Sequence, residues 1–543
     1  ITPTAADVLR TRQSFTVMPP SLPSTWLICT GCATEVLRFD HAHLNNVMQI
    51  STARFVVAVA ALILSLAHTA SAGYAQSGTS ASPILAITDV AVVDVEAESV
   101  YSGRTVIVAG DRITAIGPAD SVTVPTGARR LDGEGQFLIP GLWDMHVHLD
   151  DPEMWARHPT PDAKERLLKL LVAHGVTGVR DMGSGLDQIE RWRARWRTGA
   201  LVAPRIVTSG PIIGGSPPAM PFIQVTVGNE REARAVVRQL SRRPGVDFLK
   251  PYALVPREAY LAMMDEAQRL GMEVSGHLPF GVSIEEAVRA GQRTFEHGDG
   301  LTYRCTPDAD SLYREVEAAR ALDPFSPEAF RAAQVFQGVH PEVMARFDPA
   351  HCQELLDELA QAPMWVTPTN AVFRGLWLAT DTTYADPRMD LLPEMYRKHW
   401  REARTPPPQA AAQQKAVLQS RLALVGTLHD AGVALLAASD MAALPYTYPG
   451  SSLHDELALM VEAGLSPAEA LATATVEPAR YLGRAYEMGT VAAGNVADLV
   501  LLQGNPLTDI EQVRNIAAVI TGGTLLDRAD LDRVLDAARN GAP

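Results

Sequence analysis

Leu138-Ile139-Pro140-Gly141-Leu142-Trp143-Asp144-Met145-His146-Val147-His148 is a short apolar run that ends in two histidines at positions i and i+2. Side chains alternate between the two faces of a strand, so both imidazoles point to the same side and form half of a metal site. The motif carries little information without a strand beneath it. His41 and His43 repeat the HxH spacing with no strand pattern before them, and we interpret that copy as chance.

The hydropathy pattern of the chain changes on either side of this run. Upstream, residues 84–139 alternate apolar and polar side chains, and a Gly110-Asp111 turn separates two strand-like runs. This pattern predicts antiparallel sheet. From about residue 140, short apolar runs alternate with segments of helical spacing such as 256–270 and 283–290. That alternation is typical of a parallel sheet covered by helices.

Eight apolar runs are candidate strands of this parallel sheet. Eight β/α repeats predict a TIM barrel, in which the chemistry lies at the carboxyl ends of the strands. The candidate strands are residues 136–148, 175–182, 205–210, 246–252, 273–277, 293–297, 365–369 and 433–440. Two long insertions, at 301–363 and 381–415, surround the seventh candidate, and we expect them to shape a substrate pocket.

The β-hairpin pattern returns near the carboxyl terminus, from about residue 486. The predicted fold class is therefore α/β, with a (β/α)8 TIM barrel and a small β-sandwich domain built from both flanking segments. The barrel is assigned to residues 140–485, and the two halves of the β-sandwich to residues 73–139 and 486–543.

The amino-terminal region has the pattern of a secretory signal peptide at residues 48–72. One positive charge at Arg54 precedes an apolar run over 55–66, and Ala70-Ser71-Ala72 supplies the small residues of a cleavage site. The printed chain starts at Ile1, and we interpret residues 1–47 as upstream translation before a true start at Met48. The expectation is a periplasmic or secreted protein with no membrane span after cleavage; the alternative is an uncleaved amino-terminal anchor.

The charge of the chain argues against one class of partner, and its cysteines allow one disulfide. Lys and Arg number 47 against 62 Asp and Glu, a net charge of −15, with no basic run that would bind phosphates. Nucleic acid is therefore not an expected partner. Cys29 and Cys32 form a CxxC in the leader with no supporting pattern. Cys305 and Cys352 are either a disulfide, which an oxidising compartment favours, or two buried thiols.

Four further candidate strands end in residues that can bind a metal. They are Lys250, His277, His297 and Asp440, each after an apolar or small-residue run. Together with His146 and His148 they would converge at one mouth of the barrel, and a divalent ion needs several ligands from separate, rigid elements. The sequence therefore predicts a metal centre at this mouth.

These segments resemble the amidohydrolase superfamily, specifically its imidazolonepropionase-like branch with the metal-dependent Xaa-Pro dipeptidases. The resemblance covers about residues 84–530 and rests on residues 138–149, 175–183 and 489–500 and on the Lys, His, His and Asp positions. It implies two divalent ions, usually zinc. His146, His148 and Asp440 would hold one ion, His277 and His297 the other, and carboxylated Lys250 would bridge them.

The bridging role of Lys250 agrees with its chemistry. A free lysine is cationic at neutral pH and cannot bind a divalent ion, whereas its carbamate is an anion with two oxygens. The alternative is a plain salt-bridging lysine beside a single ion. Zinc, manganese and cobalt all remain open, and a homo-oligomer is allowed.

Several other residues are candidates for supporting roles. Asp440 would take a proton from the attacking water and pass it to the leaving nitrogen. Tyr252 would either stabilise the oxyanion or pack in the core. Arg180 and Asp181 are interpreted as an ion pair that braces the ligands, with substrate carboxylate binding by Arg180 as the minority interpretation. His454 would support the ligands or act as a cap or surface residue.

The expected function is an exported binuclear amidohydrolase that cleaves an amide-type C–N bond with a metal-bridging hydroxide. Its substrate would be an N-acyl amino acid, a dipeptide or a cyclic amide. The Ser/Thr-Gly-Gly segment of dipeptidase-like members is absent after the lysine, where residues 250–258 read KPYALVPRE, which argues against a dipeptide. The alternatives are a lactonase or phosphoesterase on the same site, and a non-catalytic extracytoplasmic metal- or solute-binding protein.

Overall fold

The computed structural model describes residues 84–150, 161–319, 322, 326–402, 408–441 and 444–540. The predicted signal peptide, the interpretation of residues 1–47, and the motifs at Cys29, Cys32, His41 and His43 all lie outside these residues and stay predictions. Within the part described, no helix is both long and apolar enough to cross a membrane.

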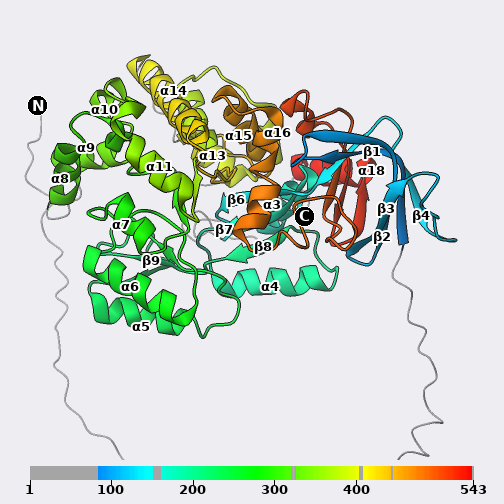
Figure 1. The fold of residues 1–543 in the computed structure, drawn as a ribbon, viewed down its shortest axis with the longest axis horizontal. Helices are drawn as coiled ribbons and strands as arrows, with labels where there is room; N and C mark the ends of the chain where they lie inside the picture. Colours follow the sequence, from blue (N-terminus) through cyan, green and yellow to red (C-terminus); the bar gives the residue numbers. More distant parts are fainter. Residues whose placement is uncertain are drawn as a thin grey trace, which may run out of the picture. The chain divides into compact units, whose positions relative to one another are not determined.

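One large sheet joins the two ends of the described chain (Figure 1). It has eight strands: β16-β15-β14-β5-β1-β2-β3 in that order, with β4 paired to β1. The strands are β1 (Ile84–Asp94), β2 (Ser99–Ala109), β3 (Arg112–Pro118), β4 (Arg129–Asp132), β5 (Phe137–Pro140), β14 (Leu499–Leu502), β15 (Ile516–Thr521) and β16 (Thr524–Asp527). β1, β2 and β3 pair antiparallel, as the alternation of residues 84–139 predicts, whereas β4 and β5 of the same range pair parallel with β1, which corrects that prediction for these two strands. The antiparallel pair β14–β5 connects the two flanking segments.

The candidate strand 136–148 is two strands rather than one. β5 belongs to the large sheet, whereas β6 (Leu142–Val147) pairs with the parallel strand β7 (Val176–Asp181). The change of sheet occurs at Gly141, whose N–H donates to the carbonyl of Asp498 at 2.8 Å. A Cβ at this position would lie 2.0 Å from Thr177 Oγ1, so only glycine allows the two sheets to meet this closely.

Parallel pairings link the remaining candidate strands. β7 pairs with β8 (Arg205–Thr208), and β12 (Thr294–Glu296) pairs with β13 (Trp365–Thr367). Isolated parallel bridges supply the other links, namely Leu249 with Val274, Gly276 with Phe295, Val366 with Leu435, and Met441 with Val147 on β6. These links start at β6 and return to it in chain order, with Asp247 N–H donating to the carbonyl of Thr208 between β8 and the following segment.

Three of the candidate strands contain at most two residues of regular strand. Only β11 (Lys250–Pro251) is regular within 246–252, and it joins a small sheet with β9 (Ile212–Gly214) and β10 (Gln224–Thr226). The candidates 273–277 and 433–440 contribute bridges only. Pro251 still pairs with Ile213 on β9, although it has no N–H to donate to the ladder.

The helices alternate with these strands, as expected. The segment 256–270 forms α6 (Arg257–Leu270), which ends at Gly271 in a left-handed conformation with φ of 67°. The segment 283–290 forms α7 (Ile284–Arg289), where Ser283 and Glu286 make a capping box. The other helices outside the two insertions are α3 (Pro161–Ala173), α4 (Leu186–Arg197), α5 (Glu230–Leu240), α12 (Asn370–Leu378), α15 (Ser451–Glu462), α16 (Pro467–Ala472), α17 (Val476–Tyr481), η4 (Ile510–Arg514) and α18 (Arg528–Arg539).

Both insertions around β13 are helical. The first contains η1 (Thr302–Cys305), α8 (Ala309–Ala319), α9 (Pro327–Phe336), α10 (Pro341–Ala345), η2 (Pro349–His351) and α11 (Gln353–Gln361). The second contains η3 (Pro387–Leu391), α13 (Glu394–Glu402) and the start of α14 (Pro408–Asp430). Cys305 and Cys352 form a disulfide, with their Cα atoms 4.7 Å apart and a sequence separation of 47. The disulfide closes a loop that contains α8, α9 and α10.

Replacing Cys305 and Cys352 together by alanine should lower the free energy of unfolding by about 4 kcal/mol. The disulfide removes the loop-closure entropy of 47 residues from the unfolded chain. Urea unfolding followed by circular dichroism measures the change. The parent protein treated with a reductant is the matched control and should lose the same amount. A double variant as stable as the oxidised parent would contradict the prediction.

Candidate metal centre

The groups that end the candidate strands lie together. The ring centroids of His146 and His148 are 5.4 Å apart, those of His146 and His297 5.0 Å, and those of His277 and His297 4.9 Å. Asp440 Oδ1 lies 3.5 Å from Nε2 of both His146 and His148. Ligand atoms of His146, His297 and Asp440 all lie within 4.8 Å of one another. The arrangement therefore offers several nitrogen and oxygen ligands around one point.

Lys250, the first residue of β11, and Tyr252, directly after β11, reach the same place. Tyr252 lies with its ring centroid 4.5 Å from that of His277. The ammonium nitrogen of Lys250 lies 5.9 Å from the centroid of the Tyr252 ring, and it is buried with no hydrogen-bond partner. Burial lowers the pKa of Lys250, which favours the neutral amine over the ammonium ion.

Hydrogen bonds fix the proton of three imidazoles on Nδ1. Nδ1 of His148 lies 3.2 Å from the carbonyl oxygen of Gly183, and Nδ1 of His146 lies 2.7 Å from Glu296 Oε2. Carbonyl and carboxylate oxygens only accept. Nδ1 of His297 lies 2.7 Å from Thr369 Oγ1, whose own hydroxyl donates to the carbonyl of Pro368. In each neutral ring the lone pair is therefore left on Nε2, the form that binds a divalent ion.

Burial keeps these imidazoles neutral. It lowers the pKa of His148 and of His297 to about 3, and it lowers the pKa of His146 and His277 well below the ordinary value. Burial also raises the pKa of Asp440. His146 Nε2 and His277 Nδ1 are buried without a hydrogen-bond partner, as is the Lys250 nitrogen. Each such atom costs about 1–3 kcal/mol, so this donor set fits a bound cation.

The backbone is strained where several of these residues leave their strands. His297, Thr369 and Asp440 have φ angles of 59°, 53° and 49°. Residues other than glycine rarely adopt this left-handed region, and each costs on the order of 1–3 kcal/mol. Strain of this kind persists only where the surrounding packing holds it, and it clusters at functional sites.

Arg180 forms an ion pair with Glu296, not with Asp181 as the sequence suggested. Arg180 Nη2 lies 2.9 Å from Glu296 Oε1, and both side chains are fully buried. Asp181 instead accepts hydrogen bonds from Ser184 and Thr208. The correction has a simple cause, because consecutive residues of a strand point to opposite faces. Arg180 also donates to other buried groups, so it has no free edge for a substrate carboxylate.

Two acidic residues near the ligands were not recognised in the sequence. Glu296 joins Arg180 to the Nδ1 of His146 and thereby fixes that ring. Asp144 accepts from the Ser439 N–H at 2.9 Å and from the Ser439 hydroxyl at 2.5 Å, and burial raises its pKa to about 6. The only signal for both was a carboxylate within an otherwise apolar strand, two residues before His146 or directly before His297.

His454 does not lie with the ligand groups. It is buried on α15, where its Nε2 is 2.8 Å from the carbonyl oxygen of His174 and its ring centroid is 6.0 Å from that of His174. His174 precedes β7, so this contact is at the amino end of that strand, whereas the ligand groups follow the carboxyl ends. This placement corrects the expected catalytic or supporting role of His454.

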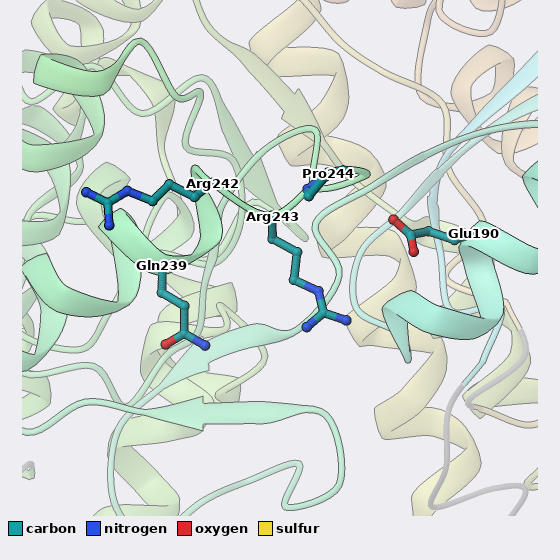
Figure 2. Close-up of a pocket in the computed structure, with 5 residues that line it drawn as sticks. All are labelled: Glu190, Gln239, Arg242, Arg243 and Pro244. Carbon is teal, nitrogen blue, oxygen red and sulfur yellow. The ribbon is translucent and has the colours of Figure 1, made fainter. Parts of the chain in front are cut away.

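None of the candidate ligand groups lines a polar cavity of about 490 Å³, whose lining side chains are drawn in Figure 2. Glu190 on α4 lines one side, and Gln239, Arg242, Arg243 and Pro244 at the end of α5 line the other. These last residues directly precede the segment that leads to Lys250, so they lie at its amino end. Arg243 is already paired with Asp187 at 2.5 Å.

One family model matches most of the chain. The profile of the amidohydrolase family matches residues 137–526. An adenine deaminase of Ruegeria sp. (strain TM1040) is 26% identical over 247 residues, which are 42% of this chain and 37% of the deaminase. The chain thus spans well under half the length of that curated relative.

Solved structures match over most of the chain. A candidate prolidase from Bifidobacterium longum is 25% identical with a TM-score of 0.56, and the match covers 84% of this chain and 99% of that protein. The bottromycin amidohydrolase is 24% identical with a TM-score of 0.62, and the match covers 83% of this chain and 90% of that protein. At 24% identity, the second likeness shows the fold alone.

Proposed function

This chain belongs to the amidohydrolase family, and from that premise we propose that it is a binuclear metal-dependent hydrolase of an amide-type C–N bond. Family membership and the relatives support a hydrolase that acts on C–N bonds. The family and the solved structures also support a fold with a TIM barrel and a β domain. The observation that carries the finer proposal is the set of Nε2 lone pairs on His146, His148 and His297 that surround Asp440. Their Nδ1 protons are held by outer partners.

In the proposed centre, His146, His148 and Asp440 would hold one ion, and His277 and His297 would hold the other. Carboxylated Lys250 would be a ligand of both ions, and zinc is the metal we propose. Bound divalent ions would supply Lewis acidity, which lowers the pKa of water and polarises a carbonyl group. Neutral Lys250 is the form that takes up carbon dioxide, and burial favours that form.

The side chains of this protein have distinct tasks in the proposed reaction. Asp440 accepts a proton from the attacking water on a carboxylate oxygen and donates it to the leaving nitrogen. Tyr252, beside His277, donates a hydrogen bond to the oxygen that becomes negatively charged. Glu296 keeps the His146 ring in its required tautomer and orientation.

The finer architecture and the location are also proposals. We propose that the strands and bridges linked from β6 back to β6 form a (β/α)8 barrel, and that the eight-stranded sheet from both flanks is the core of a β-sandwich domain. We also propose that the protein is exported and works outside the cytoplasm. The disulfide between Cys305 and Cys352 supports that location.

Metal content per chain tests the proposal most directly. Protein produced from Gly73 with bicarbonate present should hold about two divalent ions per chain, and Lys250→Ala should hold about one, because the bridging ligand is lost. Lys415→Ala, an exposed lysine on α14, is the matched control and should keep both ions. A content near zero that added metal cannot raise would overturn the binuclear centre.

A substrate screen separates the proposed reaction from its alternatives. N-acyl amino acids, cyclic amides and dipeptides should be hydrolysed in a reaction that a chelator stops. Hydrolysis of lactones or phosphoesters, without hydrolysis of any amide, would show that the protein is a lactonase or a phosphoesterase. Bound metal with no hydrolysis of any class would favour the binding protein.

A further inference from the structure

A mostly apolar cavity of about 350 Å³ lies against the first insertion. Leu254 and Phe280 line one side, and Val316 on α8, Leu322, and Phe330 and Ala333 on α9 line the other. No charged side chain contributes to its lining in the described part of the chain. A charged group placed against these described side chains would lose its water without gaining a partner among them, so this lining favours an uncharged group.

The same two loops build this cavity and carry residues of the metal centre. Ala253 and Leu254, which line the cavity, directly follow Tyr252. Phe280 follows His277 by three residues, and its N–H donates to the carbonyl of Ala253 at 2.8 Å. The ring centroids of Tyr252 and His277 are 4.5 Å apart. The two loops that line the cavity therefore also meet at the candidate metal centre.

The insertion side of the cavity is held in place. Phe336 on α9 packs edge-to-face on Phe280, with ring centroids 4.7 Å apart, and the disulfide from Cys305 to Cys352 closes the loop that contains α8 and α9. Two large apolar side chains of the lining are nevertheless exposed, Phe330 at 65% and Leu322 at 42%. Large apolar side chains that stay exposed beside an apolar cavity are typical of a ligand-binding site.

We propose that this cavity binds an uncharged alkyl or aryl substituent of the amide substrate. The proposal rests on the proposed function and names the class of substrate. The volume is near the lower end of the range for small-molecule pockets, about 300–1,000 Å³, so it suits one aromatic ring or a short alkyl chain. The substituent belongs either to the acyl half or to the amine half of the substrate, and the two halves are separable experimentally.

Binding of hydrolysis products to the metal-loaded protein tests the proposal without turnover. One series is the straight-chain carboxylates from acetate to octanoate, for the acyl half. The other is glycine, alanine, norvaline and norleucine, for the amine half. Isothermal titration calorimetry should show about fourfold tighter binding per added methylene in one of the two series, until the cavity is full. The series that responds identifies the half that carries the substituent.

Variants in the cavity should remove this dependence on chain length. Ala333→Trp fills the cavity and should make acetate and octanoate, or glycine and norleucine, bind alike, while metal content stays unchanged. Phe330→Ala, a milder change, should reduce the gain per methylene. Tyr486→Ala removes an aromatic side chain that is 78% exposed and does not line the cavity, and it should leave both series as in the parent.

The outcomes distinguish this proposal from the function on which it rests. Equal affinities along both series in the parent, together with hydrolysis of short N-acyl amino acids, would overturn the cavity proposal and leave the hydrolase. A chain-length dependence that Ala333→Trp and Phe330→Ala both leave intact would also overturn it. A dependence abolished by these variants, in a protein that hydrolyses no amide, would support the cavity and overturn the proposed reaction.

Discussion

Replacing Asp440 by asparagine should lower kcat on an amide substrate by about 10²–10⁴-fold, the usual contribution of a general acid–base group. Asp440 Oδ1 lies 3.5 Å from the Nε2 atoms of His146 and His148, at the centre of the ligand groups. An asparagine amide has nearly the same shape but cannot accept and return a proton. Most of the metal should remain, because the other ligand groups are unchanged.

Steady-state kinetics and elemental analysis on the same preparations check this result. Asp357→Asn, at an exposed position of α11, is the matched control and should keep full activity. Full activity in Asp440→Asn would remove Asp440 from the reaction. Loss of both activity and metal would instead show that Asp440 acts mainly as a ligand.

Replacing Arg180 by methionine should lower the free energy of unfolding by about 3–5 kcal/mol, because it leaves the fully buried Glu296 without its charged partner. The variant also removes the hydrogen bond from Arg180 to the carbonyl of Met145 on β6. Urea unfolding followed by intrinsic fluorescence measures the change. The matched double variant combines Arg180→Met with Glu296→Met. It leaves no unpaired buried carboxylate, so it should unfold at a higher urea concentration than Arg180→Met alone.

Metal affinity tests the role of Glu296 in positioning His146, separately from its ion pair with Arg180. Glu296→Gln keeps an oxygen that can accept from His146 Nδ1, so it should retain metal affinity better than Glu296→Ala. The alanine variant should bind metal about 10–100-fold more weakly, the usual effect of losing a group that orients a ligand. Equal metal affinity in both variants and the parent would mean that Glu296 serves only the ion pair with Arg180.

The candidate ligand residues could be selected from the sequence because the pattern that marks them is local. His146 and His148 share a face through the two-residue period of a strand, and Lys250, His277, His297 and Asp440 each end a short apolar run. The α/β class could be predicted for the same reason. A buried face makes apolar residues recur with the period of a strand or of a helix, and this repeat is visible among neighbouring residues. Ser283 and Glu286 likewise mark the start of α7 within four residues.

Other features depend on contacts between distant segments. Arg180 meets Glu296 across 116 residues and Asp144 meets Ser439 across 295, and no local period encodes such pairs. The sequence placed Arg180 beside Asp181, but the pleat separates them. It also could not show that Gly141 is the crossing point between two sheets, or that His454 packs at the amino end of β7.

The residue types and spacing of the chain thus determine which groups end the strands and the chemistry they can offer. Packing alone decides which imidazole nitrogen is free, because that depends on the acceptors opposite Nδ1, on Gly183, Glu296 and Thr369. Packing also creates the apolar cavity from α8, α9 and two loops. A cavity is the space left between side chains, so its volume and lining exist only once distant segments have met.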